Sequence, residues 1–451
     1  MNNKTMKTSL TLSETITITS MLFGMFFGAG NLIFPVYMGQ MAGSNVWPAI
    51  IGFIITGVGL PLLGVAALGI SKSNGLQELS SKVSRRYGVF FTCALYLTIG
   101  PLFAIPRCAT VPFEAGVIAM LGEGTSATMA LAIFSGIFFI AVLAFSLKPG
   151  KIMVWIGKIL NPLFLCCLAI FVVAAFLNPG ASIADVQPDA NYQSGAFFNG
   201  FLEGYNTLDA LASLAFGIVV INVIKGLGIE RPEDIATNTV KAGVFSCIMM
   251  GIIYICITVV GVQSRGFTET CANGAEALYV IANHYFGGVG TFILAATVTF
   301  ACLKTAVGLT TSCAETFTGL FPKGPSYKAW AIVFTVVAFL IANLGLSAII
   351  SYSIPVLMFL YPLAITLILL ALFGKYYNHD KAVYASVTGF TLVAALFDLV
   401  KSLPAGLYGV INGDAIMSVG SLLPFSSLGM GWIVPAIVGL VVGLVLRKTA
   451  K

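Results

Sequence analysis

The sequence predicts an all-α integral membrane protein with about twelve transmembrane helices. Of its 451 residues, 58% are hydrophobic and only 9% are charged, and the mean hydropathy is +0.98. In a soluble domain about a quarter of the residues are charged. So few charges could not cover the surface of a soluble fold of this length. The composition therefore excludes a soluble enzyme, a nucleic-acid-binding protein and a secreted disulfide scaffold.

The individual spans follow from the charge-free runs, since a membrane helix needs about 20 apolar residues. Residues 15–71 contain no charge, so this run holds two spans separated at 39–45, and the run 329–374 divides likewise near Asn343. The predicted spans are 14–38, 46–70, 88–120, 126–146, 152–177, 205–224, 242–263, 289–319, 329–344, 349–373, 382–400 and 429–446. Apolar pieces within 403–428 leave eleven or thirteen spans open.

The basic residues predict the orientation. With the N-terminus in the cytoplasm and the sides alternating, the non-cytoplasmic segments hold only Arg265 and Lys401. The cytoplasmic segments hold Lys4, Lys7, Lys72, Lys82, Arg85, Arg86, Lys148, Lys151, Lys158, Lys225, Arg231, Lys241, Lys323, Lys328, Lys375, Lys381, Arg447, Lys448 and Lys451. This is the positive-inside pattern, and it predicts that both termini are cytoplasmic.

The first span is interrupted near its middle by Gly24, Gly28 and Gly30, with Pro35 following. Glycine is a poor helix former and proline removes a backbone donor. Opened backbone at membrane depth persists only where it lines a cavity or meets polar partners. The N–H groups of Gly28, Ala29 and Gly30 could bind a carboxylate, and the carbonyls before them a cation, as at transporter binding sites. Close helix packing through small residues is the alternative.

Two later spans offer matching features. In the sixth span, small residues at 211–217 follow Asp209, so spans one and six would be equivalent broken helices if the two halves are inverted repeats. In the eighth span, the hydroxyls of Thr310 and Thr311 could complete a cation shell begun by carbonyls of the first span, because oxygen ligands suit a hard cation. The alternative is that each threonine bonds the carbonyl four residues back.

Few charges lie inside the spans. Apart from Lys158, which is counted with the cytoplasmic segment before it, Arg107 and Lys304 are the only basic residues there, and Glu114, Asp209 and Glu315 are the available acids. Intramembrane charges usually face the interior of the bundle and pair, and helical spacing places Lys304 and Glu315 near one face. Arg107, Asp209, Lys304 and Glu315 are therefore candidates for gating or ion coupling, with a buried structural pair as the alternative.

In these motifs the chain resembles the bacterial branched-chain amino acid:cation symporters. The resemblance covers essentially the whole chain and is most specific in Phe26-Phe27-Gly28-Ala29-Gly30-Asn31-Leu32-Ile33-Phe34-Pro35 and in Gly100-Pro101-Leu102-Phe103-Ala104-Ile105-Pro106-Arg107. More distantly, the core is similar to the five-plus-five inverted-repeat fold of LeuT-type transporters. The resemblance implies one transporter domain over 1–451 in the bacterial cytoplasmic (inner) membrane, with inverted repeats at about 14–177 and 205–373, additional helices at 382–446, and broken helices one and six.

The resemblance also implies roles for individual residues. The backbone N–H groups of Gly28, Ala29 and Gly30 would hold the carboxylate of the substrate. The residues that would border its amine or its aliphatic side chain are Phe26, Ser213 and Phe216. The groups that would bind one sodium ion are the carbonyls of Gly24, Phe27 and Val307 and the hydroxyls of Thr310 and Thr311. Leu211 stands where some relatives have a threonine, which argues against a second sodium at Asn31, and the role of Glu315 is open.

The implied function is sodium-driven symport of leucine, isoleucine and valine by alternating access, with Na⁺ as the coupling ion and no enzymatic activity. An aliphatic pocket distinguishes one methylene by only about 1–3 kcal/mol, so the three substrates should share it. A proton-coupled or exchange carrier of another amino acid or a nucleobase is the alternative, with Asp209 or Glu315 as the proton site. A membrane enzyme or a channel is disfavoured, because the sequence contains no intramembrane His- or Asp-rich cluster and no repeated carbonyl filter.

Overall fold

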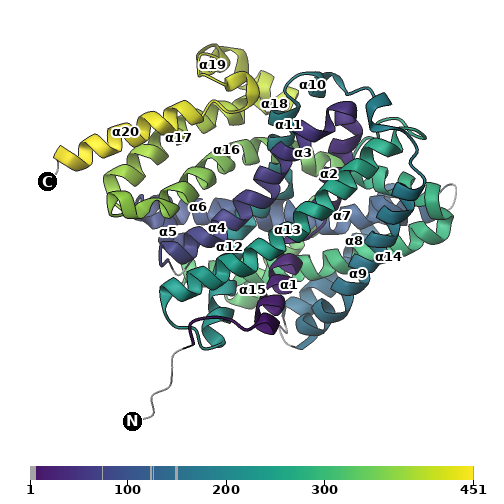
Figure 1. Ribbon diagram of the computed structural model, residues 1–451, viewed down its shortest axis with the longest axis horizontal. Helices are drawn as coiled ribbons and strands as arrows, with labels where there is room; N and C mark the ends of the chain where they lie inside the picture. Colours follow the sequence, from purple (N-terminus) through teal and green to yellow (C-terminus); the bar gives the residue numbers. More distant parts are fainter. Residues whose placement is uncertain (1–6, 74, 122–123, 125, 148–150, 450–451) are drawn as a thin grey trace, which may run out of the picture.

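The computed structural model describes residues 7–73, 75–121, 124, 126–147 and 151–449. Every regular element in this part of the chain is a helix, which confirms the predicted all-α class. The helices form one bundle, and the C-terminal helices α17 and α20 lie side by side along one edge of it (Figure 1).

The first predicted span is broken where the glycines predict it. The helix α1 (Leu12–Phe26) ends before residues 27–29, and α2 (Gly30–Ala42) then continues the span. The second span consists of α3 (Val46–Ile54) and α4 (Leu60–Ile70), joined by a π-helical turn.

The third span is also irregular. It contains α6 (Arg85–Leu97) and α7 (Ala104–Pro112), and Gly100 between them has a non-helical backbone. Pro101 lacks the N–H that would continue the ladder of hydrogen bonds. The helix α5 (Leu76–Ser81) precedes this span, inside the segment 75–88 where the sequence predicts a short amphipathic helix. The next spans are the helices α8 (Ala127–Ser146) and α9 (Lys151–Leu177).

Two short helices, α10 (Ala190–Gln193) and α11 (Ala196–Glu203), connect the two halves. The main helices of the second half are α12 (Asp209–Gly226), α13 (Pro232–Ser264), α14 (Gly274–Leu320), α15 (Tyr327–Ala342) and α16 (Leu346–Leu372). The sixth span is bent by 40° between Gly217 and Val219, and α14 kinks at Gly287, whose φ of 59° favours glycine. The remaining helices are α17 (Lys381–Lys401), α18 (Ala405–Val410), α19 (Gly413–Gly420) and α20 (Ile433–Thr449).

Each predicted span coincides with one or more of these helices. Within the described residues, 7 helices are long and apolar enough to cross a membrane, or 8 if the bent pair in α12 is one span. The shorter apolar helices are Leu12–Phe26, Phe164–Leu177, Tyr327–Ala342 and Ile433–Arg447. The count of twelve crossings stays a prediction.

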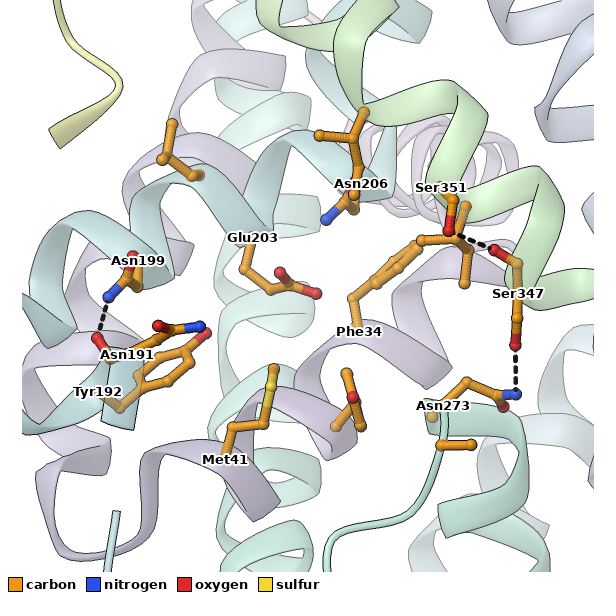
Figure 2. Close-up of a pocket in the computed structure, with 16 residues that line it drawn as sticks. Phe34, Met41, Asn191, Tyr192, Asn199, Glu203, Asn206, Asn273, Ser347 and Ser351 are labelled. Carbon is orange, nitrogen blue, oxygen red and sulfur yellow. Dashed lines mark hydrogen bonds between the residues drawn. The ribbon is translucent and has the colours of Figure 1, made fainter. Parts of the chain in front are cut away.

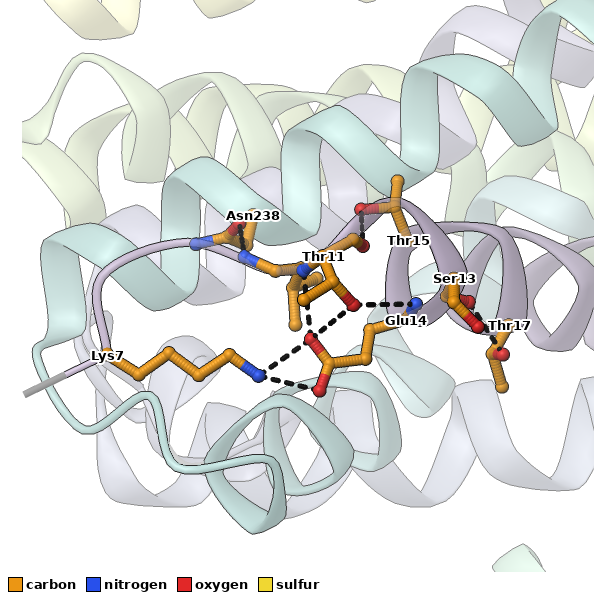
Figure 3. Close-up of polar contacts among 8 residues, drawn as sticks. Lys7, Thr11, Ser13, Glu14, Thr15, Thr17 and Asn238 are labelled. Carbon is orange, nitrogen blue, oxygen red and sulfur yellow. Dashed lines mark hydrogen bonds and ion pairs between the residues drawn. The ribbon is translucent and has the colours of Figure 1, made fainter.

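Polar contacts fix the N-terminal end of α1 (Figure 3). Thr11 and Glu14 form a capping box at the start of α1, and the Lys7 ammonium lies 2.6 Å from the Glu14 carboxylate. The side chain of Asn238 on α13 accepts from the Leu10 N–H and donates to the Thr8 carbonyl, each at 3.0 Å. The segment before α1 is therefore attached to α13.

Candidate functional site

The break in the first span frees backbone N–H groups, which carry partial positive charge, and carbonyl groups, which carry partial negative charge. The Phe27 N–H still bonds the Phe23 carbonyl, at 2.7 Å, but the N–H of Gly28 donates to Asn31 Oδ1 at 2.8 Å and does not continue the ladder. The last carbonyls of α1 and the first N–H groups of α2 have no partners within their helices. The carbonyls favour a cation and the N–H groups favour an anion.

A central cavity of about 40 Å³ lies at this break, between α1, α2, α7, α12 and α14. The structure places most of the predicted substrate-binding residues on its wall. They are Phe26, Gly28, Ala29, Gly30 and Phe216. Met25, Ile99, Leu208 and Leu309 add apolar surface, and Asn31, Arg107 and Asp209 add polar groups. A mainly apolar wall with a few convergent polar groups is the usual lining of a small-molecule site.

Ser213 is a predicted substrate-binding residue that does not line this cavity. Its hydroxyl donates to the Ala210 carbonyl at 2.7 Å and faces α4, where a Cβ on Gly64 would lie 1.9 Å from Ser213 Oγ. Ala212 and Phe216 line the cavity instead. They are four residues apart and share one helix face, whereas the next position along the helix points elsewhere.

Asp209 is the buried acid of the central cavity. It begins α12, and it is 2% exposed. Its Oδ2 accepts from Asn31 Nδ2 at 2.5 Å and from the Tyr254 hydroxyl at 3.0 Å. Asn31 Nδ2 also donates to the Tyr254 oxygen. Three spans thus meet at one carboxylate, and Tyr254 is a site residue that sequence analysis missed, because nothing along the chain relates α13 to the break in the first span.

Arg107 separates the central cavity from a second one. It is 2% exposed, and it donates from Nη1 to the Asn206 carbonyl at 2.8 Å and from Nη2 to Ser353 Oγ. Its guanidinium carbon lies 5.3 Å from the centroid of the Phe34 ring. Phe34 and Asn206 line the second cavity, whereas Arg107 lines the central one. These three residues therefore form the partition between the two cavities.

We call the second cavity the vestibule. It measures about 350 Å³ and lies between α2, α10, α11, the start of α14 and α16. The carboxylate of Glu203 points into it, toward Phe34 (Figure 2). Asparagine and serine side chains line the vestibule together with aromatic and aliphatic ones, such as Tyr192 and Met41. Burial raises the pKa of Glu203 to about 7, although a hydrogen bond from Asn206 and the charge of Arg107 act in the opposite direction.

On α14, the residues that line the central cavity are not those predicted to bind sodium. Thr305 and Leu309 line the central cavity, and the Thr305 side chain is the nearest neighbour of the Gly28 Cβ position, at 3.3 Å. At 100° per residue, Thr310 and Thr311 lie well off the face that carries Thr305. The predicted sodium ligands Gly24, Phe27, Val307, Thr310 and Thr311 all lie outside the cavity lining, and the sodium site they would form stays a prediction.

The two predicted hydroxyls are nevertheless unusual. Those of Thr297, Thr299, Thr305 and Thr318 bond the carbonyl four residues back. Those of Thr310 and Thr311 are buried and have no hydrogen-bond partner in the described part of the chain. The expected local bond is therefore absent at both positions.

The two other predicted charges of α14 do not line the central cavity. Lys304 directly precedes Thr305, and Glu315 is exposed, about three turns further along the helix. Among the described residues, no group of three or more His, Cys, Asp or Glu side chains could hold a metal ion.

Comparison with known proteins identifies the family. Residues 11–450 match the family described as branched-chain amino acid transport protein. The chain belongs to this family. It is 52% identical to the branched-chain amino acid permease BrnQ of Lactobacillus delbrueckii subsp. lactis over 434 residues, 96% of each chain. It is 40% identical to the permease BraB of Bacillus subtilis, covering 98% of this chain and 97% of that one.

A further family relative is the branched-chain amino acid transport system 2 carrier protein of Pseudomonas aeruginosa, at 39% identity over 96% of this chain and 95% of the other. Among solved structures, the chain is similar to Mhp1, a nucleobase-cation-symport-1 family transporter, with a TM-score of 0.63, 14% identity, and coverage of 100% and 96% of the two chains. Its inward-facing conformation gives a TM-score of 0.64. These similarities confirm the LeuT-type transporter fold and a transport family in place of an enzyme family.

Proposed function

We propose that this chain is a symporter that imports leucine, isoleucine and valine together with sodium across the bacterial cytoplasmic membrane, with both termini in the cytoplasm. The observation that carries the proposal is the central cavity, which lies where α1 ends, α2 begins and α12 begins. Interrupted helices around a cavity at membrane depth are characteristic of secondary transporters. Family membership and the names of the relatives support branched-chain amino acids as substrates.

Substrate recognition in this proposal combines the start of α2 with apolar walls. The first N–H groups of a helix attract an anion, so those of Ala29 and Gly30 would bind the substrate carboxylate. The Gly28 N–H is already bonded to Asn31, which moves the anion site one residue along the chain from the predicted position. Phe26 and Phe216 would contact the aliphatic side chain.

Sodium would be bound by oxygen atoms near the end of α1. The carbonyls of Gly24 and Phe27 lie at this end, and carbonyl and hydroxyl oxygens suit a hard cation. Two sets of α14 residues could complete the shell. Thr305 contacts the break, whereas Thr310 and Thr311, with the carbonyl of Val307, offer buried hydroxyls that have no hydrogen-bond partner within the described residues. The variants Thr305→Ala and Thr311→Ala distinguish the two sets, because only the true ligand should raise the half-saturating sodium concentration.

Alternating access would connect the central cavity with each side in turn. The proposed orientation places the vestibule on the external side, behind the partition formed by Arg107, Phe34 and Asn206. The attachment of the N-terminal segment to α13 lies at the opposite end of α1. We propose that the inverted repeats 14–177 and 205–373 move relative to each other during this cycle, with Lys304 and Glu315 as remaining candidates for ion coupling.

The test is uptake of labelled leucine into proteoliposomes that contain the purified full chain. We expect an inward sodium gradient to drive accumulation, and we expect isoleucine and valine to compete within about tenfold of leucine, since methylene differences are worth only about 1–3 kcal/mol. Potassium in place of sodium is the matched control.

A proton-coupled carrier on the same scaffold is the second candidate, because Asp209 places a buried carboxylate on the cavity wall. Uptake that is indifferent to sodium and sustained by a proton gradient would select this candidate. Uptake of nucleobases in place of branched-chain amino acids would reject the proposed substrates.

A further inference from the structure

We infer that Asp209 binds the ammonium group of the transported amino acid, in a subsite that it forms with Asn31 and Tyr254. This inference rests on the proposed function, because it concerns the substrate of that transport. It assigns the carboxylate a role in substrate recognition, whereas sequence analysis placed Asp209 among the residues for gating or ion coupling.

The position of Asp209 brings it to the substrate. It lines the central cavity together with Ala29 and Gly30. Its partner Asn31 directly follows Gly30 in the first turn of α2. The anion-attracting N–H groups and the carboxylate are therefore neighbours on one cavity wall. An amino acid carries its carboxylate and its ammonium on the same carbon atom, so it can meet both groups at once.

The hydrogen bonds at Asp209 bear on the protonation state of its carboxyl group. Asn31 Oδ1 accepts from the Gly28 N–H, so the amide nitrogen must be the atom that faces Asp209. Asn31 Nδ2 donates to the Tyr254 oxygen and to Asp209 Oδ2, and the Tyr254 hydroxyl hydrogen is then directed to the same Oδ2. Two hydrogen bonds donated to one carboxylate oxygen favour the ionised form of Asp209.

The charge of Asp209 lacks a basic partner. The ion pairs in the described part of the chain join Lys7 to Glu14 and Arg265 to Asp189, and neither involves Asp209. The start of α12 stabilises a nearby negative charge, but a helix terminus carries only about half of an elementary charge. An intramembrane carboxylate of this kind indicates a binding site for a cation.

The surrounding groups favour an ammonium group over a metal ion. A hard metal ion requires several oxygen ligands. Around Asp209, however, Asn31 Oδ1 is engaged with Gly28, and the Tyr254 oxygen accepts from Asn31. Both side chains direct hydrogens toward the carboxylate, so the atoms that face Asp209 Oδ2 are donors and not oxygen ligands for a metal ion. An ammonium group needs fewer acceptors, and the carbonyls at the end of α1 can supply those that Asp209 does not.

The experiment compares leucine with 4-methylpentanoate, which is leucine without its ammonium group. Both compete for labelled leucine uptake in proteoliposomes of the wild type, Asp209→Asn, Asp209→Glu and the control Asp185→Asn, in which an exposed aspartate is replaced. Truncation of one partner of a buried charge pair costs 2–5 kcal/mol or more. We therefore expect wild type and Asp185→Asn to prefer leucine by about 100-fold or more.

In Asp209→Asn we expect leucine to bind about 100-fold more weakly, while 4-methylpentanoate changes little, so that the preference disappears. Asp209→Glu keeps the charge and should retain most of the preference. Size-exclusion chromatography and thermal unfolding of each variant show whether it is folded. If Asp209→Asn does not fold, the wild-type preference and Asp209→Glu still decide the question.

Three outcomes overturn the inference. In the first, the wild type fails to distinguish leucine from 4-methylpentanoate. In the second, folded Asp209→Asn keeps the wild-type preference. In the third, Asp209→Asn shifts the half-saturating sodium or proton concentration while the preference is unchanged, which would assign the carboxylate to the coupling ion. Failure of the wild type to take up any branched-chain amino acid would instead reject the proposed function.

Discussion

Replacement of Gly261 by alanine tests how closely α13 must approach α2, the second half of the broken span. A Cβ on Gly261 would lie 2.1 Å from the Val36 carbonyl oxygen and 2.9 Å from its carbon. Gly39 on α2 meets the Thr258 carbonyl in the same way, at 2.1 Å. Small residues permit such close contact between membrane helices. An added methyl would therefore require the two backbones to separate by about 1 Å to restore a normal van der Waals distance.

The expected cost of this separation is about 1–3 kcal/mol, as for other overpacked interiors. It is partly hidden by the helix propensity of alanine, which exceeds that of glycine by about 1 kcal/mol. Gly251→Ala is the matched control, because Gly251 lies in the same helix and a Cβ there has no neighbour within 4 Å. The difference between the two variants isolates the clash.

We would measure thermal unfolding of both variants in the same detergent, together with initial rates of leucine uptake. Gly261→Ala should unfold at a lower temperature than Gly251→Ala and transport more slowly, because α2 carries the anion-attracting turn. Equal unfolding temperatures for the two variants would refute the close contact between α2 and α13.

Three further predictions concern polar side chains. Arg107→Lys keeps the charge but loses the forked donors to Asn206 and Ser353. The variant should take up leucine about tenfold more slowly or worse. An uptake rate equal to that of the exposed control Arg85→Lys would exclude the partition role. Glu114→Ala removes the acceptor of the Leu346 N–H at the start of α16 and of the Asn273 amide. The free energy of unfolding should therefore fall by about 1–3 kcal/mol relative to Glu269→Ala. Identical unfolding curves for the two variants would contradict this prediction. The pKa of Glu203 in the folded protein is about 7, above its ordinary value of 4.5, so the folded state retains a proton that the unfolded state releases. The free energy of unfolding should therefore fall as pH rises from about 4.5 to 7. A pH–stability profile that Glu203→Gln leaves unchanged would be evidence against this titration.

Much of the fold is readable from the sequence because charges and glycines have strong effects in a membrane. Charge-free runs locate the helices, and Gly28 and Gly30 predict the break that separates α1 from α2. Such features act locally along the chain. Gly100 shows the same effect, since the backbone of the third span departs from a helix there.

The parts of the site that sequence analysis missed depend on rotation and depth of helices. Ser213 and Ala212 are equally small, and only the packing of α12 against Gly64 shows which of them faces the cavity. Whether Thr305 or Thr311 lies toward the break depends on the rotation and depth of α14, and its kink at Gly287 changes both. One contact of the site could have been predicted from the sequence, because an asparagine three residues after Gly28 can accept a local hydrogen bond from the Gly28 N–H.

The break in α1 leads to a last prediction, on stabilisation by substrate. Its open N–H and carbonyl groups lie in an environment where an unsatisfied polar group costs about 1–3 kcal/mol or more. Asn31 satisfies the Gly28 N–H, and a zwitterion can satisfy groups of both signs. At a leucine concentration of about 100 times its Kd, the free energy of unfolding should rise by roughly 2.7 kcal/mol. Thermal unfolding with leucine, 4-methylpentanoate and 3-methylbutylamine measures this effect. If the two analogues, which each lack one charged group, stabilised the protein as much as leucine at equal concentration, the broken helix could not be the element that recognises the zwitterion.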